Sequence, residues 1–168
     1  MIWLDFAVLA FIYYFCLFRK RKRASKEIFT IKTLMYIYLS FVLYFTLMPV
    51  IANLPFIFGH SYKPMNLHPF KDIIYGYGDA LKQVILNVIM TIPFGILCPM
   101  LYKQKRFIFI KTFFATFFLS LFIELIQPII STRTPDITDI ITNTTGGVIG
   151  VLIYFLFKVL ITKKSKKQ

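Results

Sequence analysis

The feature that most constrains this chain is a succession of long apolar runs, because a helix needs about 20 mostly apolar residues to cross the hydrocarbon core of a bilayer. The chain is 58% hydrophobic with a mean hydropathy of +0.70, whereas soluble domains are roughly 45–50% apolar. We predict an all-α fold, a polytopic integral membrane helical bundle with about five transmembrane helices, forming a single membrane domain over residues 1–168. The predicted spans are 2–18, 34–51, 80–101, 107–130 and 140–161.

The basic residues give these spans an orientation. Most of the 20 Lys and Arg fall in three clusters that an arrangement of five spans places on one side of the membrane. The clusters lie at 19–32, 103–111 and 158–167, and the exceptions are Lys63, Lys71, Lys82 and Arg133. Because cytoplasmic loops are enriched in Lys and Arg, we predict a multi-pass protein of the cell membrane with its N-terminus outside and its C-terminus in the cytoplasm.

The net charge of +13 does not indicate nucleic-acid binding, because the basic clusters adjoin apolar runs and no nucleic-acid-binding motif is present. Clusters in this position contact the anionic headgroups of membrane lipids, which are therefore predicted partners. The run 2–18 does not resemble a secretory signal, since its basic cluster follows the apolar residues instead of preceding them.

A few strongly polar side chains lie inside the predicted spans. Glu124 and Gln127 are three residues apart and so share one face of the fourth span, while Asn87 and Asn143 enter the third and fifth spans at a similar depth from the outside. An ionisable group at the centre of a transmembrane helix costs about 2.5–3.5 kcal/mol on insertion scales. These positions therefore need a structural or functional reason.

The short loop before the last span predicts the start of a helix. Thr134 and Pro135 are typical of an N-cap and a first helical position, which puts Asp136 and Asp139 in the first turn, where the helix dipole favours negative charge. With Asn143 the two aspartates form one polar stripe along the helix. Near that stripe lie three glycines that allow another helix to approach closely, Gly146, Gly147 and Gly150.

We expect these side chains to converge on one polar pocket open to the outside, which Arg133 would also line. Simpler roles stay open for each of them. The aspartates can serve only the helix start, Asn87 and Asn143 can only join helices, and Arg133 can neutralise an acid. Glu124 is the hardest to explain by structure alone, because a carboxylate inside a span usually marks function.

The order and spacing of these residues resemble the VanZ family of small membrane proteins. The segment Asn66–Phe70 is similar to the family's N-L-x-P-F element, and the segment 87–95 is similar to its N-x-x-x-x-x-P-F-G helix. Glu124–Gln127 is similar to E-x-x-Q, and Arg133–Gly147 is similar to R-x-x-D-I-x-D-x-x-x-N-x-x-G-G. The resemblance covers a motif-bearing core of about residues 34–160 and brings Asn66 and His68 into the candidate site.

The resemblance implies a role at the outer face of the membrane in resistance to teicoplanin, a lipoglycopeptide antibiotic, or in the physiology of the Gram-positive cell envelope. It implies no settled reaction, so two hypotheses stay open. In the first, a non-catalytic protein binds an amphiphilic glycopeptide antibiotic or a lipid-linked cell-wall component. The candidate ligand-binding residues are Asn66, His68, Asn87, Gln127, Arg133 and Asn143.

The second hypothesis is an intramembrane enzyme that modifies a lipid-linked envelope substrate. Glu124 would act as the general acid or base, and Asp136 and Asp139 are further catalytic candidates. The two aspartates could also hold a divalent cation, with His68 as an extra ligand. No motif for a metal, a cofactor or a Ser-His-Asp triad is present, so no cofactor is predicted. An ion pathway is disfavoured because the inner halves of the spans lack polar residues.

Overall fold

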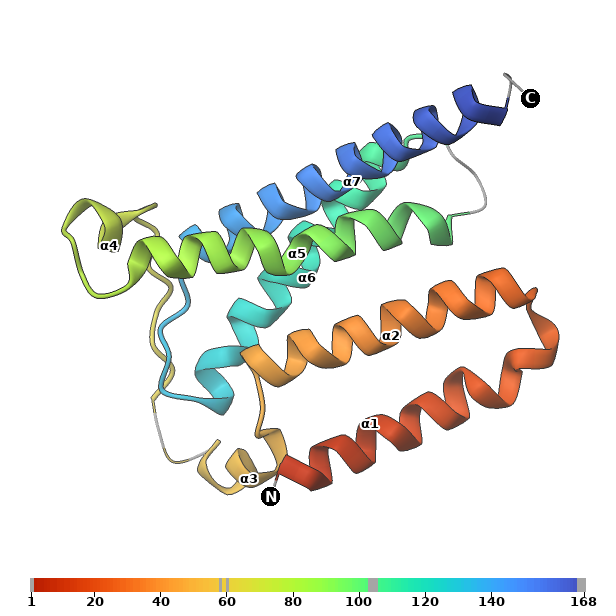
Figure 1. Cartoon of the computed structure of the whole chain (residues 1–168). Coiled ribbons are helices and arrows are strands. Elements are labelled where there is room, and N and C mark those ends of the chain that lie inside the picture. The colour runs from red at the N-terminus through yellow and green to blue at the C-terminus, as the bar shows by residue number, and fades with distance from the viewer. Residues whose placement is uncertain (1, 58, 60, 103–105, 166–168) are drawn as a thin grey trace. The chain divides into compact units, whose positions relative to one another are not determined.

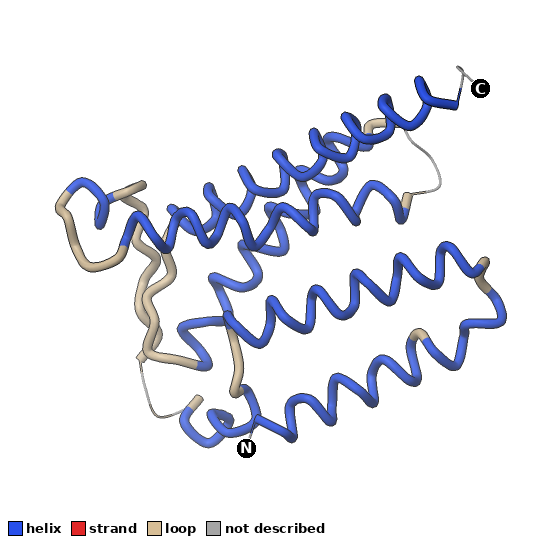
Figure 2. Tube along the Cα trace, viewed as in Figure 1, coloured by secondary structure: helices blue, strands red, loops and turns tan. Residues whose placement is uncertain are grey.

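The computed structural model describes residues 2–57, 59, 61–102 and 106–165, so the loop histidine His60 lies outside the described residues. Its elements in chain order (Figure 1) are α1 (Ile2–Cys16), η1 (Phe18–Arg23), α2 (Lys26–Thr46), α3 (Val50–Asn53), η2 (Leu54–Phe56), α4 (Lys71–Ile74), α5 (Ala80–Leu101), α6 (Ile108–Ile130) and α7 (Ile137–Ser165). Figure 2 shows the described residues as helices joined by loops. An isolated bridge pairs Asn66 with Asp136.

Within the described residues, four helical segments are long and apolar enough to cross a membrane, namely Lys26–Asn53, Ala80–Leu101, Ile108–Ile130 and Ile137–Lys163. Helix α1 is also apolar, but its 15 residues are fewer than the roughly 20 that a full crossing needs. Large apolar side chains face outward, such as Phe45 at 70% exposure, and an extensive exposed apolar surface marks membrane contact. The predicted all-α membrane bundle is confirmed, and the chain is a multi-pass membrane protein.

The contacts divide the chain into two compact units, each of which is described by itself. The first unit comprises residues 1–69 and 121–137, and the second comprises 70–120 and 138–168. The boundary passes through α6 after Ser120 and through the start of α7 after Ile137. Both helices therefore contribute residues to both units.

In the first unit, α1 and α2 form a helical hairpin joined by η1 (Figure 1). Helix α2 begins after Ser25, whose side chain accepts a hydrogen bond from the backbone N–H of Ile28 at 3.3 Å, as a serine N-cap does. The carboxylate of Asp5 is buried at 5% exposure and accepts a hydrogen bond from the backbone N–H of Ile51 at 3.0 Å. This bond ties the start of α1 to α3.

In the second unit, α5 and the first half of α6 lie against α7 at its glycines. A Cβ atom added to Gly95 of α5 would lie 2.8 Å from the Cα of Gly150, and one added to Gly147 would lie 2.8 Å from the Cβ of Thr116 of α6. Real Cβ atoms essentially never approach other atoms so closely. The predicted close approach of another helix to this glycine stripe is confirmed.

Candidate functional site

Glu124 anchors a polar cluster in the first unit. It lies on α6, is 2% exposed, and its Oε2 accepts a hydrogen bond from the backbone N–H of Asp136 at 3.0 Å. Asp136 immediately precedes α7, which begins at Ile137. The prediction that Asp136 lies inside the first helical turn is therefore wrong, whereas Asp139 does lie there.

The chain is held extended around Asp136 by Asn66, which explains why the helix begins later than predicted. The backbone N–H of Asn66 donates to the carbonyl of Pro135 at 2.8 Å, and the backbone N–H of Ile137 donates to the carbonyl of Asn66 at 3.0 Å. The side chain adds a third bond, from Asn66 Nδ2 to Asp136 Oδ2 at 2.7 Å. We call Asn66, Glu124 and Asp136 the Glu124 cluster.

Three other predicted site residues of this unit have separate partners. His68 is exposed, and its backbone N–H donates to Asn66 Oδ1 at 3.1 Å. Arg133 is exposed, and its backbone N–H donates to Ser131 Oγ at 3.4 Å. Gln127 is 5% exposed, and its Nε2 donates to the carbonyl of Thr46 at 3.1 Å. The amide of Gln127 thus joins α6 to the end of α2, and a role of these three residues in ligand binding stays a prediction.

The second unit contains a cluster centred on Asn143 of α7. Asn143 Nδ2 donates to Ser120 Oγ at 2.9 Å, and Thr91 Oγ1 donates to the carbonyl of Asn143 at 2.7 Å. One turn earlier on each helix, Asn87 Nδ2 of α5 donates to Asp139 Oδ1 of α7 at 2.7 Å. These bonds agree with the simpler expectation that the two asparagines join helices. We call these five residues the Asn143 cluster.

One atom of the Asn143 cluster stands apart from this pattern. The side chain of Asn143 is 4% exposed, and its Oδ1 is buried without a hydrogen-bond partner among the described residues. Such an atom costs free energy, because a buried carbonyl loses its bonds to water. That the Glu124 and Asn143 clusters form one pocket stays a prediction of the sequence.

A polar stripe on α6 that leads up to Glu124 was not predicted from the sequence. Thr112, Thr116 and Ser120 are at most 2% exposed and precede Glu124 at intervals of four residues, which places all four side chains along one helical face. Thr112 and Thr116 each donate a hydrogen bond to the backbone carbonyl one turn earlier, at 2.8 and 2.9 Å. The regular spacing was the available signal. The buried acid Asp5 was not predicted as a site residue either, although its position inside an apolar run was a visible signal.

Among the described residues, no set of three or more His, Cys, Asp or Glu side chains is placed to hold a metal ion. The Glu124 cluster offers one buried and one half-buried carboxylate, which accept hydrogen bonds from hydroxyl, amide or ammonium groups, and one amide, which both donates and accepts.

A family model described as VanZ/LLP1 matches residues 34–158, which is most of the chain. The chain belongs to the VanZ/LLP1 family. Protein VanZ of Enterococcus faecium is 35% identical over 123 residues, which cover 73% of this chain and 72% of that protein. No solved structure matches the chain.

Family membership confirms the resemblance drawn from the motifs. The VanZ/LLP1 match contains every residue of the Glu124 and Asn143 clusters. Helix α1, η1 and the first turns of α2 precede it, and the rest of α2 lies within it.

Proposed function

We propose that this protein uses the Glu124 cluster to recognise the polar head of an amphiphilic molecule at the outer face of the membrane, and that it thereby lowers the cell's sensitivity to teicoplanin. The ligand would be the lipoglycopeptide antibiotic or a lipid-linked component of the cell wall. The observation that carries the proposal is Glu124 itself, a carboxylate at 2% exposure in a membrane-spanning helix.

A buried carboxylate at this position is costly. The hydrogen bond from the backbone N–H of Asp136 could be accepted by a neutral amide of nearly the same shape, such as Gln. Placing an acid in a span costs about 2.5–3.5 kcal/mol at the helix centre. A carboxylate is favoured at this cost when it must attract hydroxyl, amide or ammonium donors of a ligand.

The charge distribution supports a position of this cluster at the outer face. Asn66 and Asp136 lie in connections that bear few basic residues, whereas η1 carries a run of five, Arg19–Arg23. Since Lys and Arg favour the cytoplasmic side, we place η1 and the C-terminus in the cytoplasm and the connections that carry Asn66 and Asp136 outside. With α1 inserted in the bilayer as a short apolar helix, the N-terminus also lies outside.

A second candidate function is an intramembrane enzyme acting on a lipid-linked envelope substrate. It is favoured by the burial of the Glu124 carboxylate at 2% exposure, with a second acid, Asp136, whose backbone N–H bonds to that carboxylate. A carboxylic group in a desolvated site is suited to general acid or base work. In this function Glu124 would transfer a proton to or from the substrate.

The test is the teicoplanin sensitivity of a susceptible Gram-positive host that expresses the wild type or a variant at equal membrane levels. We expect Glu124→Gln to abolish the protection although it keeps an acceptor for Asp136 N–H, and Asp136→Asn to weaken it. Glu27→Gln, which neutralises an exposed acid in the first turn of α2, is the matched control and should protect fully. Full protection by Glu124→Gln, Asp136→Asn and Asp139→Asn alike would overturn both candidate functions.

A further inference from the structure

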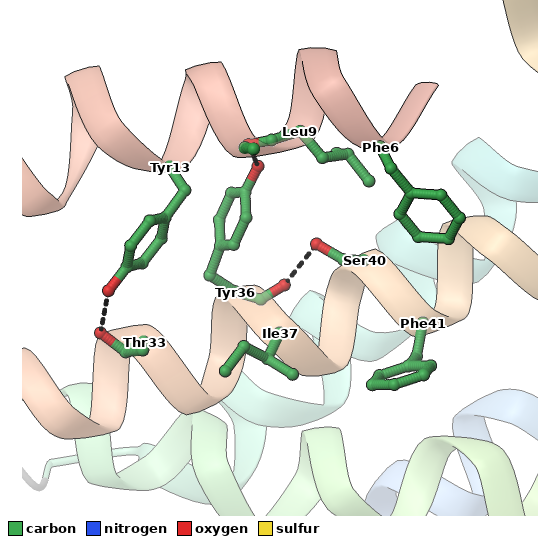
Figure 3. A pocket seen from close by; sticks show the side chains of 9 residues that line it. Phe6, Leu9, Tyr13, Thr33, Tyr36, Ile37, Ser40 and Phe41 are labelled. Carbon is green, nitrogen blue, oxygen red and sulfur yellow. Dashed lines mark hydrogen bonds between the residues drawn. The ribbon is translucent and has the colours of Figure 1, made fainter. Parts of the chain in front are cut away.

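A groove of about 370 Å³ runs between α1 and α2, entirely within the first unit (Figure 3). Its lining repeats at helical spacing on both helices, with Leu9, Ala10 and Tyr13 on α1 facing Thr33, Tyr36 and Ser40 on α2. The lining is mostly apolar carbon, with a few hydroxyl groups. The groove is therefore an apolar channel within the membrane-spanning part of α2.

Two long side chains hold the groove open. Tyr36 reaches across to donate a hydrogen bond to the carbonyl of Leu9 at 2.6 Å, and the hydroxyls of Tyr13 and Thr33 bond to each other at 3.2 Å. Both links are visible in Figure 3. Because these side chains act as spacers and Ala10 is small, the two helices cannot close the gap without breaking the links.

A space of this size does not stay empty in a bilayer, because the atoms that line a void lose their dispersion contacts. Its apolar walls offer water few partners, since a bound water needs two to four. The volume of about 370 Å³ is far larger than a single water molecule requires, about 30 Å³ in the liquid. From Phe6 to Tyr13 it is about 10 Å long at 1.5 Å per residue. These dimensions suit one acyl chain.

Positive charge lies next to one end of the groove. Tyr13 contacts Phe18 of η1 with ring centroids 6.5 Å apart, and the guanidinium of Arg21 lies 4.4 Å from the Phe18 ring centroid. Arg19 lies in turn over Phe15, at 5.9 Å. The cation–π contacts hold two guanidinium groups beside the hairpin end, and guanidinium groups bind phosphate with paired hydrogen bonds.

From these two adjoining features we infer that the α1–η1–α2 hairpin binds one anionic phospholipid, whose acyl chain occupies the groove and whose phosphate lies against Arg19 and Arg21. The groove and the arginines beside it together select this occupant, since a zwitterionic lipid would fill the groove but bring its quaternary ammonium group next to the two guanidinium groups. The α1 side of this site and both arginines precede the matched family region, whereas Tyr36 and Ser40 lie inside it. The site is separate from the proposed function of the Glu124 cluster.

The test is native mass spectrometry of the purified full chain after extraction from bilayers of equimolar phosphatidylglycerol and phosphatidylcholine. We expect the wild type to retain one phosphatidylglycerol. Ala10→Phe, which fills the groove, should retain neither lipid. Val8→Phe is the matched control, because Val8 is 47% exposed, lies two residues from Ala10 and so points away from the groove. It should behave as the wild type.

A second pair of variants tests the phosphate end. Arg19→Gln combined with Arg21→Gln should lower the preference for phosphatidylglycerol over phosphatidylcholine by about five- to thirtyfold, since each basic residue near an anionic surface contributes a factor of about five. Lys158→Gln combined with Lys163→Gln removes the same charge from the end of α7 and should leave the preference unchanged. Equal lipid retention by Ala10→Phe and Val8→Phe would overturn the inference. So would cross-linking of α1 to a second copy of the chain in place of lipid.

Discussion

The link between Asn66 and Asp136 gives the sharpest energetic prediction for the Glu124 cluster. Asn66 Nδ2 donates to the carboxylate of Asp136 at 2.7 Å, and hydrogen bonds to charged groups contribute about 1.5–3 kcal/mol to stability. Both residues are half-buried, so solvent screens part of this interaction. We therefore expect a coupling energy of about 1.5–2 kcal/mol, at the lower end of that range.

The measurement is a double-mutant cycle of Asn66→Ala and Asp136→Ala, with the free energy of unfolding taken from SDS titrations in mixed micelles. The backbone bonds of both residues survive these substitutions, because the backbone N–H and carbonyl groups remain and the acceptor of the Asp136 N–H is the carboxylate of Glu124. The control cycle combines Asn66→Ala with Glu27→Ala, whose effects should add within about 0.3–0.5 kcal/mol. A coupling no larger than that of the control would refute the view that the side-chain bond holds Asn66 to Asp136.

The remaining predictions concern helix packing and orientation. Gly150→Ala should lower the free energy of unfolding by about 1–3 kcal/mol in the same titration, because its Cβ would lie 2.8 Å from the Cα of Gly95. The control is Thr145→Ala, at an exposed position of the same helix, which should change the free energy of unfolding by less than about 0.5 kcal/mol. Equal effects of the two substitutions would contradict the packing of α5 against α7. In a background with Cys16 and Cys98 replaced by Ser, His68→Cys should react with a membrane-impermeant maleimide in intact cells, and Lys22→Cys only after lysis. The reverse pattern would overturn the proposed orientation.

The fold could be predicted from the sequence because the main determinants of the fold are local. Apolar runs of sufficient length predicted α5, α6 and the body of α7 closely, since a lipid-facing helix must be apolar nearly all round. The small residues Gly147 and Gly150 predicted a close helix contact, because only glycine leaves the space for a neighbouring backbone. The first run is apolar too, but it forms a helix of 15 residues that ends before the basic segment η1.

The candidate site was less accessible to such reasoning, because its bonds join residues distant in sequence. Nothing near Asp136 shows that Asn66, 70 positions earlier, holds the chain extended and delays the start of α7. The partner of Gln127 is likewise a backbone carbonyl 81 positions away, which side-chain patterns do not reveal. Family motifs identified Asn66 as a candidate, and the geometry then supplied its contacts.

The measurement that tests the central claim most directly is the binding of labelled teicoplanin to the purified protein in lipid nanodiscs, compared between wild type and Glu124→Gln. If the Glu124 cluster recognises the antibiotic, the wild type will bind it at least tenfold more tightly than Glu124→Gln, while Glu27→Gln will match the wild type. Equal affinity of wild type and Glu124→Gln would contradict recognition of the antibiotic by this carboxylate.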